Sequence, residues 1–296
     1  MKTILIAGGT GFIGKKIQSV LEENGYSINI LTRNPKQKNE FRWNIEQKEI
    51  DTKAFENVVS IINLCGANIG EKRWSAKRKK ELLDSRIQST QFLYSQIQNI
   101  PNLESYISAS GISCYGFEDD TKTYSEEDPF GSDYLSQLVK EWESAADLFK
   151  THCRVVKMRT AVVLDKQEGA LPKISLPIRF GIGSPIGTGK QSTSWVHITD
   201  LTNAFLYAIE NPIKGAFNIV GGNESNKEFS EKLAKTLHKP FWFPNVPAFI
   251  LQLLLGEMSI ILLKGITASN QKIIDTGFQF KFLKVQDAFE DLFKKN

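Results

Sequence analysis

The sequence predicts an α/β protein in which a doubly wound parallel sheet is followed by a smaller C-terminal α+β lobe. Two observations support this fold class. Short apolar runs alternate with longer segments of helical spacing up to about Asp165, and most of these runs contain few polar residues. Strands covered by helices on both faces have this continuous apolar character, and strands that alternate with helices form parallel β-α-β units.

The apolar runs and helical segments can be placed in order along the first half of the chain. We predict strands at Thr3–Ala7, Ser27–Leu31, Val58–Leu64, Tyr106–Ser110 and Arg154–Leu164. The helices predicted between them are Lys15–Asn24, Glu81–Gln98 and Asp133–Lys150. The first of these helices stops before Gly25, a residue type common at helix C-termini.

The regular alternation is lost after Asp165. Residues 169–191 are rich in Gly and Pro, which predicts either a loop that covers a site or a hinge to a smaller lobe. Beyond them we predict helices at Leu201–Glu210, Lys227–Leu237 and Val285–Phe293, and a strand at Ala216–Val220. We therefore divide the chain into a domain of residues 1–165, to which 192–210 return, and a lobe of residues 166–296 with a helical cap over about 245–296.

One apolar segment, Val246–Leu263, approaches the length of a membrane span. Pro247, Gln252, Gly256 and Glu257 interrupt it. A spanning helix needs about 20 predominantly apolar residues, and a central glutamate disfavours it strongly. We predict instead a buried pair of helices broken near Gly256, and we expect no membrane partner.

The length and composition agree with one large globular domain or two unequal ones. The chain has 296 residues, of which 41% are hydrophobic and 24% charged, and a chain of this length buries about three quarters of its unfolded surface. Three scattered cysteines, Cys65, Cys114 and Cys153, exclude a disulfide framework and fit a reducing compartment. Met1 is followed directly by a strand-like segment rather than a signal peptide. We expect a cytoplasmic protein.

The charge distribution argues against a nucleic-acid partner. The chain carries 37 Lys and Arg against 33 Asp and Glu, a formal net charge of +4. Its densest basic cluster, residues 77–80, is short and is followed by acidic residues, whereas nucleic-acid binders gather basic residues on one face. The sequence also has no cluster with metal-ligand spacing. We expect a small-molecule substrate, no metal and no nucleic acid, and we leave a homodimer open.

The clearest functional motif is a glycine-rich turn between the first predicted strand and the first predicted helix. It contains Gly8, Thr10, Gly11, Phe12, Ile13 and Gly14. In this context the first glycine of the spacing permits a tight turn, the second lets the backbone approach a pyrophosphate, and the third lets the helix pack closely. Free N–H groups at the helix start then hold the phosphates. The motif predicts a Rossmann dinucleotide-binding domain; a glycine turn without a ligand is the alternative.

The end of the second predicted strand indicates which dinucleotide to expect. An acidic residue about 20 positions downstream would bind a ribose 2′-hydroxyl, but the sequence there reads Leu31-Thr32-Arg33-Asn34. Arg33 can form charge-assisted hydrogen bonds to a 2′-phosphate. We therefore expect NADP(H), with Thr32 and Arg33 as contacts. NAD(H) is the alternative cofactor, and an exposed arginine without a ligand is the structural alternative.

Together these motifs resemble the extended short-chain dehydrogenase/reductase superfamily. The resemblance rests on Gly8–Gly14, Asn63-Leu64-Cys65-Gly66, Ser108-Ala109-Ser110, Tyr115-Gly116 and Trp195–Asp200. A narrower resemblance, to the atypical NAD-dependent epimerase/dehydratase-like subgroup of "epimerase family proteins", rests on Arg73-Trp74, Ser85-Arg86-Ile87, Trp142-Glu143, Gly187-x-Gly189-x-Gln191, Gly256-Glu257 and Gly277-Phe278-x-Phe280. It covers essentially the whole chain. It implies a characteristic C-terminal domain and further cofactor contacts from Leu64, Cys65, Gly66 and Ser108.

The usual active site of the superfamily is only partly matched. That site is a Tyr-x-x-x-Lys pair with an upstream Ser or Thr and an Asn. Alignment on Glu143 puts Leu135 and Val139 at the tyrosine and lysine positions. Tyr134 and Lys140 each lie one residue away, and one residue rotates a helical side chain by about 100°. The subgroup is likewise described as lacking the pair and as carrying Arg in place of Asn.

Three residues remain as catalytic candidates. Ser110 matches the usual serine at the carboxyl end of a predicted parallel strand, where open α/β sheets bind their ligands. Arg86 matches the arginine that replaces Asn. Without the usual pair, the proton donor would be Tyr134, a water or the substrate itself. A turn serine and a helix-surface ion pair are the structural alternatives for Ser110 and Arg86.

The remaining candidates concern the substrate. Arg73 and Trp74 suit a carboxylate, a phosphate or a planar group, with a helix-packing tryptophan as the alternative, and Gln191 lies in the loop expected over the site. Two functions follow. One is an NADP(H)-dependent oxidoreductase or epimerase-like enzyme acting on a small, anionic or nucleotide-linked substrate; the other is a non-catalytic NADP(H)-binding sensor. The retained Ser110 favours the enzyme, which we prefer, and the missing Tyr–Lys pair favours the sensor.

Overall fold

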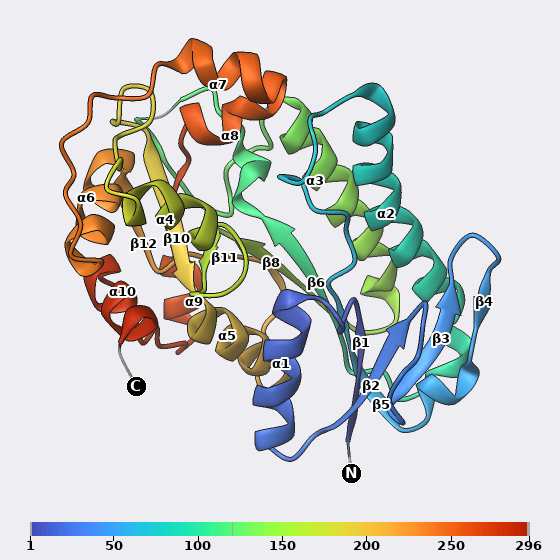
Figure 1. The fold of residues 1–296 in the computed structure, drawn as a ribbon. Helices are drawn as coiled ribbons and strands as arrows, with labels where there is room; N and C mark the ends of the chain where they lie inside the picture. Colours follow the sequence, from blue (N-terminus) through green and yellow to red (C-terminus); the bar gives the residue numbers. More distant parts are fainter. Residues whose placement is uncertain (1, 120, 295–296) are drawn as a thin grey trace.

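The computed structural model describes residues 2–119 and 121–294. Its centre is an eight-stranded sheet with the order β11-β8-β6-β5-β1-β2-β3-β4 (Figure 1). Neighbouring strands run parallel, apart from β3 and β4 at one edge. The order reverses between β1 and β5, which confirms a doubly wound sheet. The strands are β1 (Thr3–Ala7), β2 (Ser27–Thr32), β3 (Glu40–Asn44), β4 (Glu49–Ile50), β5 (Val58–Asn63), β6 (Ser105–Gly111), β8 (Arg154–Thr160) and β11 (Gly215–Ile219).

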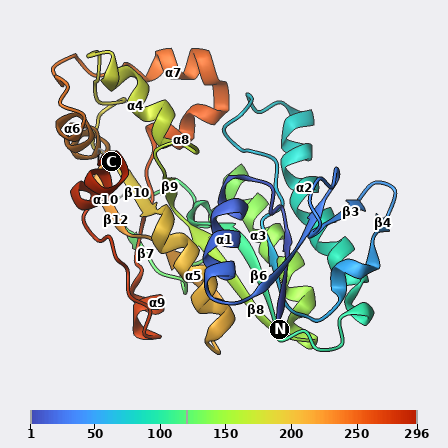
Figure 2. The same ribbon diagram turned by 60° about the horizontal axis from the view of Figure 1, so that its bottom comes forward.

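Two helices cover each face of this sheet. Helices α1 and α5 lie side by side on one face, and α2 and α3 lie on the other (Figures 1 and 2). Strand β1 is buried from both sides, because Ile4 and Ile6 pack in the core beneath α1 and α5 whereas Leu5 packs in the core beneath α2 and α3. The helices are α1 (Phe12–Glu23), α2 (Ala76–Ser95), α3 (Tyr134–Ala146) and α5 (Ile198–Glu210).

The smaller lobe is built on a three-stranded sheet with the order β12-β10-β9. Helices α4, α6 and α10 pack around a core that includes Trp195, Phe229 and Phe289. Strands β7 and β13 form a separate short parallel pair. The elements are β7 (Thr123–Tyr124), β9 (Val162–Leu164), β10 (Ser192–His197), β12 (Gly222–Ser225), β13 (Thr267–Ala268), α4 (Leu171–Arg179), α6 (Asn226–Thr236) and α10 (Val285–Phe293).

The chain passes from one sheet to the other at a single residue. We predicted one strand over Arg154–Leu164, which is wrong, because the segment breaks at Ala161. Strand β8 pairs with β6 and β11 in the main sheet, whereas β9 pairs with β10 in the smaller one. Helix α5 and strand β11 then return to the main sheet, so the two parts of the molecule are interwoven.

The apolar segment of residues 246–263 contains two helices, as predicted. Helix α7 (Ala248–Leu255) is followed by the 3-10 turn η5 (Gly256–Ser259) and helix α8 (Ile260–Leu263). The break falls at Gly256, whose φ of +61° suits a residue without a Cβ. The prediction that both helices are buried is wrong, because none of the residues of α7 or of α8 is buried. The residues of α8 are half-buried, whereas most of those of α7 are exposed.

Short elements complete the described part of the chain. They are α9 (Gln271–Asp275) and the 3-10 turns η1 (Thr52–Phe55), η2 (Ile97–Asn99), η3 (Ile112–Tyr115) and η4 (Asp147–Thr151). Within residues 2–119 and 121–294, no helix combines the length and the apolar character needed to cross a membrane.

Candidate functional site

The glycine turn joins β1 to α1 at the carboxyl edge of the main sheet. Gly8 has a φ of +82°, and a Cβ there would lie 3.1 Å from the carbonyl carbon of Leu64. A Cβ at Gly14 would lie 2.5 Å from the carbonyl oxygen of Gly9, so the third glycine of the spacing is needed for the helix to pack on its own turn. The amide of Gln18 donates to the carbonyls of Gly9 at 2.8 Å and Gly14 at 3.2 Å and fixes this arrangement.

The start of α1 is left free for a ligand. Its N-cap residue is Gly11, which has no side chain to accept from the first N–H groups, and the first turn contains no acidic residue. Thr10 is exposed, and Phe12 and Ile13, the first two residues of the helix, are half-buried. Since orphan N–H groups and the positive helix dipole attract anions, this turn can hold a phosphate.

The ends of β2 and β5 lie on either side of this turn, because both strands pair with β1. Arg33 follows β2 and is exposed, and the hydroxyl of Thr32 accepts from the backbone N–H of Asn34 at 3.4 Å. Burial raises the pKa of the Cys65 thiol to about 12, against the opposing effects of a hydrogen bond with Ser89 and of the charges of Arg33 and Arg86. Arg33 is therefore within electrostatic reach of the end of β5, and Cys65 stays a neutral thiol at physiological pH.

Arg86 is buried beneath the segment that follows β5. Its guanidinium donates to the carbonyls of Leu82 at 2.8 Å and Ala67 at 3.2 Å and lies 4.9 Å from the ring centroid of Trp142. A Cβ at Gly66 would come within 2.8 Å of its Cζ. Burial lowers the pKa of Arg86 to about 10, so the side chain remains a cation at neutral pH. Its Nε is buried and has no hydrogen-bond partner in the described part of the chain.

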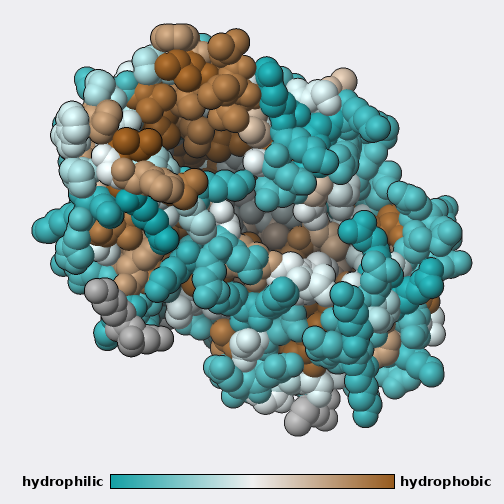
Figure 3. Space-filling view, viewed as in Figure 1, coloured by the Kyte–Doolittle hydropathy of each residue, from teal (hydrophilic) through white to brown (hydrophobic). Residues whose placement is uncertain are grey.

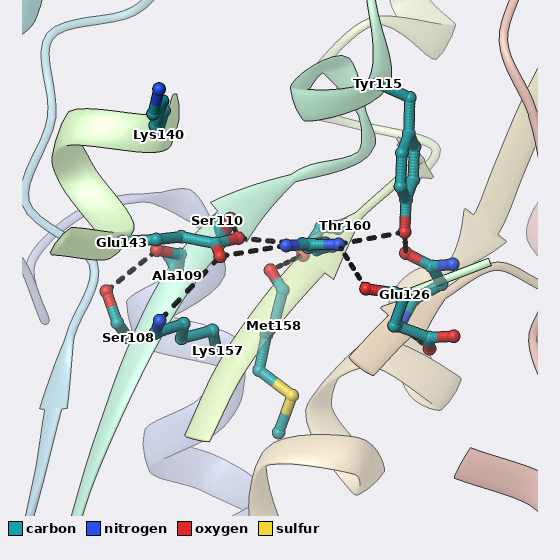
Figure 4. Close-up of polar contacts among 12 residues, drawn as sticks. Ser108, Ala109, Ser110, Tyr115, Glu126, Lys140, Glu143, Lys157, Met158 and Thr160 are labelled. Carbon is teal, nitrogen blue, oxygen red and sulfur yellow. Dashed lines mark hydrogen bonds and ion pairs between the residues drawn. The ribbon is translucent and has the colours of Figure 1, made fainter. Parts of the chain in front are cut away.

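Ser110, at the end of β6, belongs to a buried charged network (Figure 4). Its hydroxyl donates to Oε1 of Glu143 on α3 at 2.6 Å. Arg159 on β8 forms a bidentate pair with the same carboxylate, with Nε 2.8 Å from Oε1 and Nη2 3.0 Å from Oε2. Lys157 places its Nζ 3.9 Å from Oε2 of Glu143 and 2.6 Å from Oδ1 of Asp147. The proton of Ser110 is thus already committed to a carboxylate that two cations neutralise.

The network continues toward the smaller lobe. Nη1 of Arg159 donates to the hydroxyl of Tyr115 at 3.1 Å, and this hydroxyl donates to Oδ1 of Asn218 on β11 at 2.7 Å. The backbone N–H of Asn218 donates to Oε1 of Glu126 at 2.7 Å. The sequence motifs do not include Arg159 or Lys157, although one signal for them is present. They lie two residues apart, on one face of a strand whose five central residues are buried, and buried charges must be paired.

The positions of the usual Tyr and Lys are filled by apolar residues. Leu135 and Val139 are buried on the face of α3 that also carries Glu143. Tyr134 lies against α2 instead, where its hydroxyl donates to the carbonyl of Lys79 at 3.1 Å. Burial raises the pKa of this tyrosine. Lys140 points away from the Ser110 network (Figure 4) and is exposed.

The three substrate candidates are not brought together by direct contacts. The indole N–H of Trp74 donates to the carbonyl of Ile69 at 3.0 Å, and its ring packs 5.3 Å from that of Tyr134. Arg73 is exposed and lies beside the backbone of Gly256, where a Cβ would meet its Nη2 at 3.0 Å. The amide of Gln191 is buried and is used on backbone carbonyls 2.9 and 3.0 Å away.

Three further observations concern candidate groups among the described residues. Ser108 is buried, and its hydroxyl donates to the carbonyl of Ala109 at 2.9 Å. His197 caps α5, since its Nδ1 accepts from the N–H of Thr199 at 3.1 Å, and burial lowers its pKa to about 4. Within residues 2–119 and 121–294, no group of three or more His, Cys, Asp or Glu side chains could hold a metal ion.

Known proteins resemble this chain along its whole length. The NAD dependent epimerase/dehydratase family matches residues 4–220, and a domain of unknown function (DUF1731) matches residues 246–292. The chain is 36% identical over 316 aligned positions to epimerase family protein SH2119 of Staphylococcus haemolyticus, which covers 99% of each chain. It is 33% identical to epimerase family protein SDR39U1 of Mus musculus, covering 98% of this chain and 99% of the mouse protein.

A solved structure agrees with these relatives. The crystal structure of human epimerase family protein SDR39U1 (isoform 2) with NADPH superimposes with a TM-score of 0.90 at 30% identity, covering 99% of this chain and 100% of the human one. The family match spans the glycine turn, Ser110 and Glu143, and the relatives extend it through the C-terminal cap. The chain therefore belongs to the NAD dependent epimerase/dehydratase family.

Proposed function

We propose that this protein binds NADP(H) and acts as an oxidoreductase or epimerase-like enzyme on a small, anionic or nucleotide-linked substrate. One observation carries the cofactor assignment: α1 begins without a side-chain cap or a first-turn carboxylate, at the same edge of the sheet as the exposed Arg33. The human relative solved with NADPH supports the choice of dinucleotide. When bound, NADP(H) would supply or accept a hydride.

The residues at this edge fit a dinucleotide phosphate. The N–H groups that begin α1 suit a pyrophosphate, and the N-cap residue Gly11 has no side chain to obstruct the approach to them. Arg33 offers a planar set of donors to a 2′-phosphate, with Thr32 beside it. The backbone of residues 64–66 would line the site, held from below by the Arg86 guanidinium. Ser108 would support this wall through the end of β6.

Substrate chemistry is assigned to Ser110, Arg86 and Tyr134. Since the Ser110 proton is donated to Glu143, a substrate carbonyl must replace this carboxylate as its acceptor, while Arg159 keeps Glu143 paired. Arg86 would stabilise negative charge that develops on the substrate. Tyr134 would be the proton donor. Burial raises its pKa, so its hydroxyl would release the proton only once negative charge has developed on the substrate oxygen.

The wall of the substrate site is assigned to three residues outside this set. Arg73 has an exposed guanidinium and would bind the anionic group of the substrate. Trp74 and Gln191 would shape the site by holding the backbone carbonyls to which they donate.

A non-catalytic NADP(H) sensor is the second candidate, and one observation favours it. Leu135 and Val139 are buried in the apolar core beside α3. They occupy the helix face on which the tyrosine and lysine of a complete Tyr-x-x-x-Lys pair would lie. A protein that only reports the NADP(H) level would not need those groups.

Single-turnover oxidation of bound NADPH distinguishes the two functions. We expect a carbonyl or nucleotide-sugar substrate panel to contain a compound that oxidises bound NADPH, and Ser110→Ala to slow this step by at least about 100-fold with NADPH affinity nearly unchanged. Ser144→Ala, an exposed serine on α3, is the matched control and should react as the wild type. If no compound oxidises NADPH bound to the wild type, the sensor is the better assignment.

A further inference from the structure

An extended apolar surface lies on the smaller lobe, on and around α4 and α7. Figure 3 shows the part over α7 as the brown area at the top of the molecule, while most of the remaining visible face is hydrophilic. Its side chains are between 36% and 76% exposed. We call this set the apolar surface; its members are Leu176, Phe180, Ile182, Trp242, Phe243, Phe249, Ile250, Leu253 and Leu254.

The segments that carry the apolar surface are held together by the backbone. Gly183 pairs with Phe241, and Ile186 pairs with Val246. These bridges place the segment after α4 beside the segment before α7, so exposed side chains from both form one area. Helix α7 is apolar at every position except Gln252, yet none of its residues is buried. A helix that is apolar all round is normally covered.

The apolar surface is large for a monomer. Phe180, Trp242 and Phe249 are 76%, 71% and 67% exposed, so at about 200 Å² per aromatic side chain these three leave about 400 Å² in contact with water. That area already lies within the range of the largest patch on a typical monomeric protein, and such patches mark binding surfaces. Six further side chains of the apolar surface enlarge it.

The charge around the apolar surface is strongly one-sided. Segments 170–190 and 239–264 contain five basic residues and one acidic residue, Glu257, so they account for the whole formal net charge of +4 and leave 32 basic and 32 acidic residues elsewhere. Glu257 is paired with Lys79 at 2.6 Å. The five cations are exposed, and none forms an ion pair with a described residue; they are Lys173, Arg179, Lys190, Lys239 and Lys264.

We propose that the apolar surface is a docking site for the interface of an anionic phospholipid membrane. Exposed aromatic and leucine side chains would enter the headgroup and upper acyl region, and the surrounding cations would pair with lipid phosphates. Helix α7 has eight residues and a length of about 12 Å, far less than the ~30 Å of a hydrocarbon core. It would therefore lie along the interface and not span it.

The charge distinguishes this partner from a second copy of the chain. A two-fold contact through the apolar surface would bring the unpaired cations of both copies together, which is unfavourable. An anionic bilayer satisfies the cations and the apolar side chains at the same time. The sequence predicts no membrane partner, because residues 246–263 are too interrupted to span a bilayer. Docking on the membrane surface depends instead on the exposure of α7, which an apolar composition does not reveal.

Trp242 provides the measurement. It is 71% exposed, whereas Trp43, Trp74, Trp142 and Trp195 are at most 9% exposed. The whole chain is mixed with phosphatidylcholine vesicles in which about a third of the lipid is phosphatidylglycerol. We expect the protein to float with the vesicles and the Trp242 emission to shift to the blue. Lipids brominated on the acyl chain should quench this emission. Pure phosphatidylcholine vesicles, or 0.5 M salt with the anionic vesicles, should lower binding about tenfold.

Matched variants test which residues are responsible. The double change Phe249→Ser and Leu253→Ser should lower vesicle binding at least about tenfold, and Lys173→Glu with Lys239→Glu should do so only with anionic vesicles. Leu148→Ser, an exposed leucine on η4, should bind as the wild type. Thermal unfolding of each variant checks that it is folded.

Two results would overturn the proposal. One is failure of the wild type to bind anionic vesicles. The other is a combination of two effects of the Phe249→Ser and Leu253→Ser change. It abolishes a dimer that the wild type forms in sedimentation, and it leaves vesicle binding intact. The second result would assign the apolar surface to a second copy of the chain.

Discussion

The glycine turn and the Ser110 network lie at the same edge of the sheet, but they use their polar groups in opposite ways. At the turn, the start of α1 has no side-chain cap, and Arg33 is exposed. In the network, Ser110, Glu143 and Arg159 are buried and bonded to one another. The polar groups of the turn can bind a ligand. Those of the network already bond to one another, and they join β6, α3 and β8.

This difference predicts that the network, rather than the turn, dominates stability. Arg159→Met leaves the Glu143 carboxylate buried with Lys157 as its remaining cation, and we expect it to lower the free energy of unfolding by about 3–5 kcal/mol. Urea unfolding measures the change. Adding Glu143→Leu should recover much of the loss, because an apolar pair replaces a buried charge.

The exposed Lys150, which pairs with the half-buried Asp147 at 3.0 Å on the rim of the network, is the control for this prediction. Lys150→Ala should change the unfolding free energy by less than about 1 kcal/mol. If Arg159→Met proves as mild as Lys150→Ala, the network does not hold the fold together.

At the turn, the largest effect is expected on binding. A Cβ at position 14 would overlap the carbonyl oxygens of Gly9 and Gly8, at 2.5 and 2.6 Å, so Gly14→Ala must shift the backbone that would hold a pyrophosphate. We expect NADPH and NADH affinities to fall together by about 100-fold, with about 1–3 kcal/mol of lost stability. Isothermal titration calorimetry checks the affinities. Gly70→Ala, whose added Cβ would have no neighbour closer than 3.8 Å, should bind as the wild type.

The smallest and most selective effect is expected at Arg33. Arg33→Asp removes charge-assisted hydrogen bonds to a 2′-phosphate, each worth about 1.5–3 kcal/mol, so NADPH affinity should fall about 10- to 100-fold while NADH affinity stays the same or rises. The control is Lys53→Asp. Lys53 is exposed and precedes the start of β5, so it lies near the amino ends of the parallel strands, opposite the glycine turn. Equal losses for both dinucleotides would contradict the 2′-phosphate assignment.

The sequence allowed the turn to be predicted better than the network, and the reason is the range of the interactions involved. The glycine spacing is local, since a turn and the helix that follows it are formed by consecutive residues. Glu143 meets Ser110 across 33 residues and Arg159 across 16, so no local pattern shows that they touch. The burial of α7 was predicted wrongly because an apolar helix has the same composition whether it lies in a core or on a surface.

Strand boundaries illustrate the same limit. The apolar character of Arg154–Leu164 continues through Ala161, so it gives no sign that β8 and β9 belong to different sheets. Strand β3 contains Arg42 between Phe41 and Trp43 and was missed because it is short and half-polar. The parallel strands of the core are predictable from the sequence because both of their faces are buried. Such strands are apolar at nearly every position.

The return of α5 and β11 to the main sheet has a consequence for how the protein is made. Synthesis proceeds from the N-terminus, and domains generally fold as they emerge. Here the sheet face beside α1 stays uncovered until α5 ends at Glu210, and the edge strand β11 is complete only at Ile219. Residues 162–197, including β9 and α4, must emerge before the sheet they interrupt can close. The main sheet therefore stays incomplete from the end of β8 at Thr160 to the end of β11 at Ile219, which is about sixty residues of translation, or several seconds at ~5–20 residues per second.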